Sequence, residues 1–213
     1  MNIITLPYGP LQSNMYIILG ESGFYIVDPS VGPDMVSRKC PSLDITTLKA
    51  VLITHGHYDH ISSVFEWIKA FPETKLFMSD KDTGLLSDPQ STCSCFIGNG
   101  SDYSFVSSDV AGLALWSSSD DQFEIRAVPT PGHTSGSVTF DVKDRKDGSR
   151  ALFTGDTVFA GSIGRTDFPS GDISEMYSSI DIIKKYPDEL PIYPGHGPSS
   201  TIGYEKKNNP YFL

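Results

Sequence analysis

A run of seven residues, 54–60, holds three of the five histidines in the chain. In order it reads Thr-His-Gly-His-Tyr-Asp-His. His55 and His57 are two positions apart, so in extended backbone both project to one side and can bind one cation. Asp59 and His60 follow where the chain turns into a helix, displaced far enough to reach a second cation. This run constrains the fold strongly, because it requires a strand that ends, and a helix that starts, beside metal ions.

The residues on either side of the run have the matching periodicities. Ala50–Thr54 is a short apolar stretch that suits a buried central strand. Gly56 lacks a Cβ and leaves room for a tight bend between the two histidines. After the run, apolar residues fall at i, i+3, i+4 and i+7, one face of an amphipathic helix: Ile61, Val64, Phe65 and Ile68.

The other two histidines also follow predicted strands. His133 lies in a Pro-Gly-His turn after Phe123–Pro129, and His196 lies in a second such turn after Pro191–Tyr193. Asp156 follows the predicted strand Ala151–Thr154 and is the remaining candidate ligand. Any one histidine is more often a surface or core residue, but scattering would rarely place all five at strand ends. Imidazole and carboxylate suit zinc, iron or manganese, and the absence of cysteine among these candidate ligands disfavours a closed structural zinc site.

The rest of the chain repeats a pattern of strands followed by a helix. Paired sheets with helices packed outside them are the architecture that this order favours. We expect a single domain over 1–213, within which the serine-rich stretch 87–122 has weak periodicity and forms a surface loop or a lid. Ser174 is the expected cap of a late helix whose Met176, Ile180 and Ile183 face inward. The further predicted strands are Met15–Leu19, Phe24–Val27, Lys75–Ser79 and Ser137–Val142.

These motifs resemble those of the metallo-β-lactamase superfamily, in which His-x-His-x-Asp-His is joined by a later His, Asp and His. The resemblance spans most of the chain and implies an αββα sandwich, an α/β fold with the metals at the strand ends. It implies that one metal is bound by His55, His57 and His133. It further implies that Asp59, His60 and His196 bind the other and that Asp156 bridges the two.

Two metals sharing these ligands keep open coordination positions, which indicates catalysis rather than a structural site. Water between them would have a pKa of about 7 and supply hydroxide at neutral pH. We expect that hydroxide to attack a carbonyl carbon, with Asp59 also passing a proton to the leaving group. A serine or cysteine nucleophile is not needed, so Cys93-Ser94-Cys95 is interpreted as incidental loop sequence.

Residue 156 narrows the choice within the superfamily. Zinc β-lactamases have Cys or Ser at the matching position. The aspartate at position 156 resembles instead the pattern of glyoxalase II (hydroxyacylglutathione hydrolase) and its relatives. Arg165 and Asp167 stand where two-domain glyoxalase II has a Lys and a Tyr for glutathione, and only 17 residues follow His196. Arg165 thus either contacts the substrate or forms hydrogen bonds with Asp167 that hold the turn in place. The tail through Asn209 and Pro210 resembles the short, single-domain hydrolases.

We therefore expect a binuclear hydrolase of acyl-thiols such as S-lactoylglutathione, with two divalent metals, zinc before iron or manganese. The first alternative is a persulfide dioxygenase with one iron on two histidines and Asp156. A lactonase is the second, because ester and thioester attack need the same hydroxide. A metal-binding module without chemistry is the third.

Composition limits the partners and the compartment. The chain has 26 acidic and 16 basic residues, a formal net charge of −10, which disfavours nucleic acid as a partner. Apolar runs fall short of the roughly 20 residues of a membrane helix. Basic residues of a secretory signal are missing before Arg38, and three cysteines make no disulfide framework. We expect a cytoplasmic protein that binds a small molecule, without a membrane or an obligate protein partner.

Overall fold

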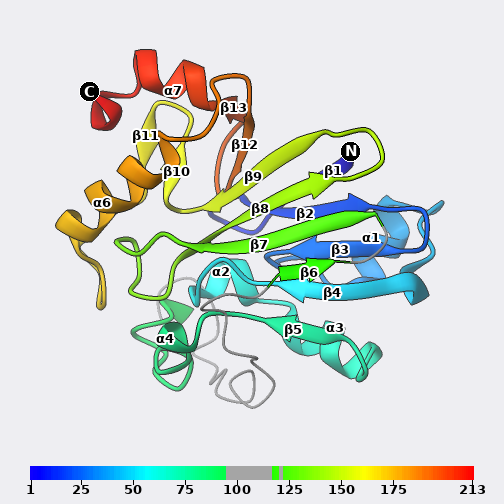
Figure 1. The fold of residues 1–213 in the computed structure, drawn as a ribbon. Coiled ribbons are helices and arrows are strands. Elements are labelled where there is room, and N and C mark those ends of the chain that lie inside the picture. The colour runs from blue at the N-terminus through cyan, green and yellow to red at the C-terminus, as the bar shows by residue number, and fades with distance from the viewer. Residues whose placement is uncertain (95–116, 120–121) are drawn as a thin grey trace.

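Two β-sheets form the centre of the structure (Figure 1). It is a computed structural model that describes residues 1–94, 117–119 and 122–213. The first sheet has the order β1-β2-β3-β4-β5, and the second has the order β13-β12-β9-β8-β7-β6. The first consists of β1 (Asn2–Tyr8), β2 (Ser13–Leu19), β3 (Phe24–Val27), β4 (Leu48–Leu52) and β5 (Lys75–Phe77). The second consists of β6 (Ser117–Ser119), β7 (Phe123–Pro129), β8 (Val138–Asp144), β9 (Arg150–Gly155), β12 (Pro191–Pro194) and β13 (Ser200–Thr201).

The two sheets repeat one arrangement. Each begins as an antiparallel meander and continues with parallel strands: β3 pairs parallel with β4 and β4 with β5, and β9 pairs parallel with β12. Parallel neighbours need a crossover, and helices supply it in both halves. These are α1 (Pro33–Lys39), α2 (Tyr58–Ile61) and α3 (Val64–Ala70) in the first half and α6 (Ile173–Ile183) in the second. The remaining elements are α4 (Asp80–Thr83), the hairpin β10 (Val158–Phe159) and β11 (Ser162–Ile163), and α7 (Ile202–Asn208).

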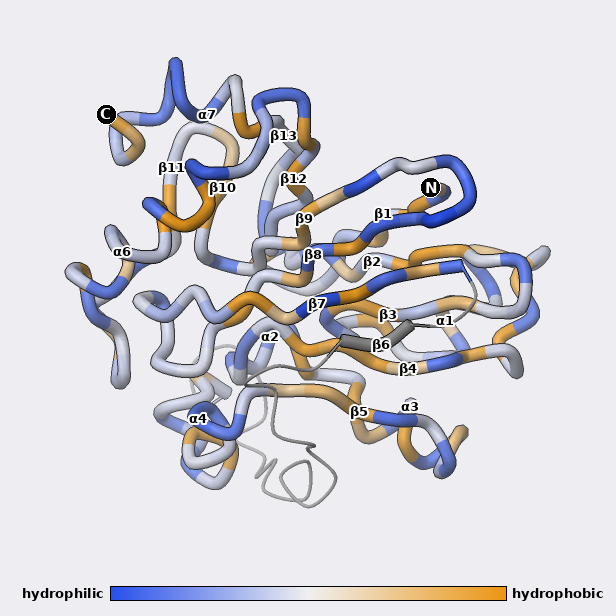
Figure 2. The backbone as a smooth tube through the Cα atoms, viewed as in Figure 1, coloured by the Kyte–Doolittle hydropathy of each residue, from blue (hydrophilic) through white to orange (hydrophobic). Residues whose placement is uncertain are grey.

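Three apolar clusters separate four layers. One lies between the first sheet and α1–α3 and includes Trp67; the second lies between the sheets and includes Phe153; the third lies between the second sheet and α6 and α7. Alternating residues of a strand serve different clusters, as Ile17 and Ile18 do on β2. Figure 2 shows hydrophobic residues along β4 and β5, which lie within this layered core. The layers confirm the predicted αββα sandwich, whose strands end at a shared edge.

Most predicted strands are confirmed within two residues, and four local expectations need correction. Strand β1 was not predicted, although it pairs with β2 along its whole length. The helix predicted after residue 60 is two helices, α2 and α3, and its Phe65 is 55% exposed, whereas Trp67 is fully buried. Asp172, not Ser174, caps α6, because its carboxylate accepts hydrogen bonds from the N–H groups of Ser174 and Glu175.

The fourth correction concerns the stretch 87–122. Its residues Ser117–Ser119 form β6, which pairs antiparallel with β7. The expectation that the stretch acts as a lid falls mainly on residues 95–116 and 120–121, which lie outside the described residues. Across the part of the chain that is described, helices stay shorter or more polar than a bilayer-crossing segment would be.

Candidate metal centre

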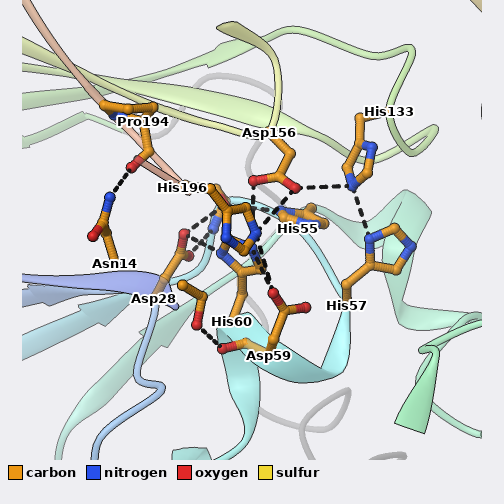
Figure 3. Close-up of polar contacts among 12 residues, drawn as sticks. Asn14, Asp28, His55, His57, Asp59, His60, His133, Asp156, Pro194 and His196 are labelled. Carbon is orange, nitrogen blue, oxygen red and sulfur yellow. Dashed lines mark hydrogen bonds and ion pairs between the residues drawn. The ribbon is translucent and has the colours of Figure 1, made fainter. Parts of the chain in front are cut away.

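All seven predicted ligands lie together at the edge where the strands end (Figure 3). The chain leaves β4 at Leu52 and reaches α2 at His57, whose φ and ψ of −74° and 145° place it as the cap of that helix. The first turn of α2 carries Asp59 and His60. Asp156 follows β9, and the loops after β7 and β12 carry the two later histidines, His133 and His196. Strand ends from both sheets thus supply one cluster.

The cluster divides into overlapping groups whose ligand atoms lie within 4.8 Å of one another. One group is His55, His57 and His133, and another is Asp59, His60 and His196. These are the two trios that the family resemblance implies. A third group, of His55, His60 and Asp156, overlaps both sides.

The Asp156 carboxylate lies between the two trios. Its Oδ2 is 3.5 Å from His133 Nε2 and 3.5 Å from His196 Nε2, and its Oδ1 is 3.4 Å from His60 Nε2. The Asp59 carboxylate contacts only the second trio, with its Oδ2 3.2 Å from His196 Nε2. Asp156 therefore has the position that a bridging ligand needs.

The buried polar atoms of the cluster test whether it fits a metal. Five of them have no hydrogen-bond partner within the described residues, and Ser30 Oγ is the other such atom there. An uncompensated buried polar atom costs about 1–3 kcal/mol, so a concentration of them indicates a missing counterpart. Imidazole nitrogen and carboxylate oxygen are donors that divalent zinc, iron and manganese accept. Four of the five atoms face the cluster, namely His55 Nε2, His60 Nε2, Asp59 Oδ2 and Asp156 Oδ1; the fifth, His57 Nε2, lies on the ring edge opposite the Nδ1 that faces His133.

The Nδ1 atoms of four histidines lie within hydrogen-bonding distance of oxygen atoms; they belong to His55, His60, His133 and His196. His133 Nδ1 lies 2.7 Å from the Arg165 carbonyl oxygen, and His196 Nδ1 lies 3.0 Å from that of Leu11. His55 Nδ1 lies 3.0 Å from Thr54 Oγ1. Such contacts set the ring orientation and leave Nε2 facing the cluster. His57 is reversed, because its Nδ1 faces His133 Nε2 at 2.8 Å.

Asp28 organises two ligands at once and was missed by the sequence analysis. Its Oδ2 is 2.9 Å from His60 Nδ1 and accepts a 2.8 Å hydrogen bond from Thr54 Oγ1, the group that contacts His55. Its Oδ1 accepts from the Thr54 N–H at 2.8 Å. Asp28 follows the buried strand β3 directly, which is the same placement as the ligands themselves and was a usable signal.

Asp82 joins the loop of His57 to the loop of His133. Its carboxylate accepts hydrogen bonds from Gly56 N at 2.9 Å, Thr134 Oγ1 at 2.7 Å and Gly136 N at 2.7 Å. A Cβ on Gly56 would lie 3.0 Å from Met78 Cε, so this glycine also allows close packing. Asp82 lies on α4, and its sequence surroundings gave no indication of this role.

The β2 strand holds the loop of His196. Asn14 Nδ2 donates to the carbonyl oxygens of Pro194 and Gly197 at 3.0 and 2.9 Å, and the Tyr16 hydroxyl donates to Pro194 at 2.6 Å. A Cβ on Gly195 would lie 2.1 Å from Asp156 Oδ1. Only glycine therefore lets this loop approach Asp156 closely enough to deliver His196.

The two sides of the cluster differ in electrostatics. Burial, with His133 next, lowers the pKa of His57 to about 3, and burial lowers that of His55, so both are neutral imidazoles at pH 7. On the other side burial opposes protonation, yet Asp59, Asp156 and Asp28 hold the pKa of His60 well above its usual value. Neutral imidazole is the metal-binding form, and the carboxylates supply negative charge to the second side.

A cavity of about 630 Å³ opens onto the cluster. Its walls include Asp59 and Asp156 together with the apolar side chains of Leu11, Phe159 and Phe168. Cys93 also lines it and is buried, whereas Cys95 lies outside the described residues, so the interpretation of this pair as incidental loop sequence stays a prediction.

Arg165 lines the same cavity but forms the predicted pair with Asp167. Its Nε and Nη2 donate to the two Asp167 oxygens at 2.7 and 2.8 Å.

Comparison with known proteins agrees with the site. Residues 8–196 match the family model of the metallo-beta-lactamase superfamily. A probable metallo-hydrolase of Streptococcus pyogenes is 32% identical over 93% of this chain and 85% of its own length. Hydroxyacylglutathione hydrolase GloC of Haemophilus influenzae is also 32% identical, over 99% of this chain and 98% of its own.

Two solved structures are similar over almost their whole length. The BLEG-1 B3 metallo-beta-lactamase has a TM-score of 0.83 and 30% identity, covering 99% of both chains. TTHA1623, solved in a di-iron-bound form, has a TM-score of 0.78 and 27% identity, covering 98% of this chain and 99% of its own.

Proposed function

This chain belongs to the metallo-beta-lactamase superfamily, and on that premise we propose that it is a metal-dependent hydrolase of acyl-thioesters. The observation that carries the proposal is the cluster of unpartnered buried ligand atoms beneath an open cavity. A structural metal site would be closed by protein, whereas this one is reached from the cavity through Asp59, Asp156 and His57.

His55, His57 and His133 would hold one divalent ion, and Asp59, His60 and His196 would hold a second. Asp156 faces both. Bound there, the ions would supply a water acidified to a pKa of about 7 and polarisation of a carbonyl oxygen. Zinc is our first choice, with iron or manganese as alternatives for the same donors.

The chain's own residues would orient the reaction. Burial acts against ionisation of Asp59, but His60 and His196 lower its pKa, so it is a carboxylate at neutral pH. It lines the cavity, where it can hold a proton and return it to the leaving thiolate. Phe159 and Phe168 line the cavity beside it and would exclude water from the bound acyl-thiol.

A persulfide dioxygenase is the second candidate, and one observation favours it. His55, His60 and Asp156 form a group of two histidines and one carboxylate, the ligand composition of mononuclear iron oxygenases. The contacts of Asp59 with His60 and His196 favour the hydrolase, because a mononuclear site has no use for that second trio. Lactone cleavage needs the same chemistry and is a further outcome of the assay.

The test is hydrolysis by protein purified without chelator and reconstituted separately with zinc, manganese and iron. The substrates are S-lactoylglutathione, an uncharged acyl-thioester, a lactone and a β-lactam. We expect thioester turnover of about 1–10³ s⁻¹, the usual range of enzymes, and trace activity on the β-lactam. Oxygen uptake with glutathione persulfide, in the absence of thioester cleavage by any metal form, would replace the hydrolase with the dioxygenase.

A further inference from the structure

We propose that the cavity selects an acyl-thiol whose part beyond the thioester is uncharged, rather than a glutathione conjugate. The inference deepens the proposed hydrolase function and rests on it. The positions of the cations, acids and apolar side chains around the candidate metal centre support it.

The segments that build the site lack basic residues. The sequence contains no Lys or Arg in 1–37, 50–68, 82–125, 127–142, 151–164, 166–183 or 186–205. These segments carry every predicted ligand and, apart from Arg165, every residue lining the cavity. Residues 95–116 and 120–121, which lie outside the described part, belong to the same basic-free sequence and add no cation. Arg165 is therefore the basic side chain on which anion recognition would depend.

Arg165 is already committed to an intramolecular partner. Both carboxylate oxygens of Asp167 accept from its guanidinium, and the Arg165 Cζ lies 3.7 Å from the centre of the Phe168 ring. This bidentate pair uses the fork geometry that a substrate carboxylate would need. The cavity is thus lined by a guanidinium whose charge is balanced by Asp167, and not by a free cation.

Two buried acidic residues lie behind the ligand histidines. Asp28 contacts His60, and Asp82 joins the loops of His57 and His133, both from buried positions. A glutathione conjugate carries two carboxylates remote from its thioester, and these would approach a wall that offers them no free Lys or Arg. The walls beyond the ligands, Leu11, Phe159 and Phe168, instead suit an uncharged chain or ring.

The test compares S-lactoylglutathione with its diamide, in which both carboxylates are replaced by isosteric amides. Binding is measured separately with S-butylglutathione and its diamide, thioethers that cannot be hydrolysed. With the zinc-loaded protein we expect the diamides to show a kcat/KM and an affinity about fivefold or more above those of the acids. Hydrolysis of both thioesters with the acid preferred, together with tighter binding of S-butylglutathione, would overturn the inference while leaving the hydrolase intact.

The variant Asp167→Asn tests the role of Arg165 directly, because it removes the carboxylate that pairs with the Arg165 guanidinium. We expect the affinity for S-butylglutathione to rise about fivefold, the value of an exposed ion pair worth up to about 1 kcal/mol. The matched double variant Arg165→Gln with Asp167→Asn should lose that gain. Equal affinities in both variants would contradict the assignment of Arg165 as a masked cation. Preferential binding of the diamide without cleavage of any thioester would support the uncharged cavity and overturn the hydrolase.

Discussion

The Nδ1 atom of His60 lies 2.9 Å from Oδ2 of Asp28, and this contact turns Nε2 of His60 toward the ligand cluster. The same carboxylate oxygen accepts from Thr54 Oγ1, which contacts Nδ1 of His55. One buried carboxylate thus orients a histidine of each trio. Groups behind a ligand commonly change metal affinity tenfold to a hundredfold when they are removed.

Asp28→Asn should therefore weaken metal binding by about tenfold to a hundredfold, because an amide cannot accept from Thr54 and hold His60 with equal strength. Asparagine tolerates the positive φ of 54° at this position, so the backbone should be retained. Competition titration with a chromophoric chelator measures the affinity. Asp34→Asn, an exposed change of equal charge on α1, is the control. Equal affinities in both variants would remove Asp28 from the site's organisation.

Asp82→Ala should destabilise the fold by about 3 kcal/mol. It removes three hydrogen bonds to one carboxylate and leaves the buried N–H groups of Gly56 and Gly136 without an acceptor, each at about 1–3 kcal/mol before relaxation. Urea unfolding of the metal-loaded protein gives the free energy change. Asp80→Ala, two residues earlier and exposed, should change it by less than about 0.5 kcal/mol. If Asp82→Ala lowers the free energy of unfolding by no more than the control does, the hydrogen bonds that join the two ligand loops contribute no stability.

Alkaline pH should weaken the contact between Tyr186, which lies three residues after α6, and Asp141 on β8. Burial, followed by the Asp141 carboxylate that accepts its hydroxyl hydrogen bond at 3.1 Å, raises the Tyr186 pKa to about 12 from an ordinary value of about 10. Since the folded pKa is the higher one, this contribution to stability is complete below pH 10 and is lost as the pH rises toward 12.

Between about pH 10 and 12, the window set by the two pKa values, the stability of Tyr186→Phe should consequently depend less on pH than that of the unaltered chain. Urea midpoints at several pH values measure it, with Tyr177→Phe, an exposed tyrosine of α6, as the control. Parallel pH profiles for Tyr186→Phe and the unaltered chain would contradict the assignment.

The ligands could be predicted from sequence because each is a histidine or aspartate on the segment that follows an apolar strand. That signal is local, and the structure brings all of its members together. Asp28 carries the same signal after β3 but was not included among the candidates. Asp82 carries none, since its partners Gly56 and Gly136 become neighbours only when the sheets pack.

The errors of the fold prediction have local causes as well. Phe65 satisfied the helical spacing, but the helix is interrupted between α2 and α3. As a result Trp67 faces inward, and its Nε1 donates to the Val31 carbonyl oxygen at 2.7 Å. Ser174 is a reasonable cap by residue type, yet Asp172 is the residue with extended backbone before the helix, and its carboxylate accepts from the N–H groups of Ser174 and Glu175. Strand β1 was missed because its identity depends on pairing with β2, a long-range property.

The most direct test of the binuclear hydrolase is the number of metal ions per chain, measured by mass spectrometry after zinc reconstitution and gel filtration. We predict two ions for the unaltered chain and one for Asp59→Ala, with thioester turnover falling by at least a hundredfold in the variant, as expected for loss of a group at the reacting centre. Thioester hydrolysis at full rate in Asp59→Ala, or in an unaltered chain stripped of metal by a chelator, would contradict it.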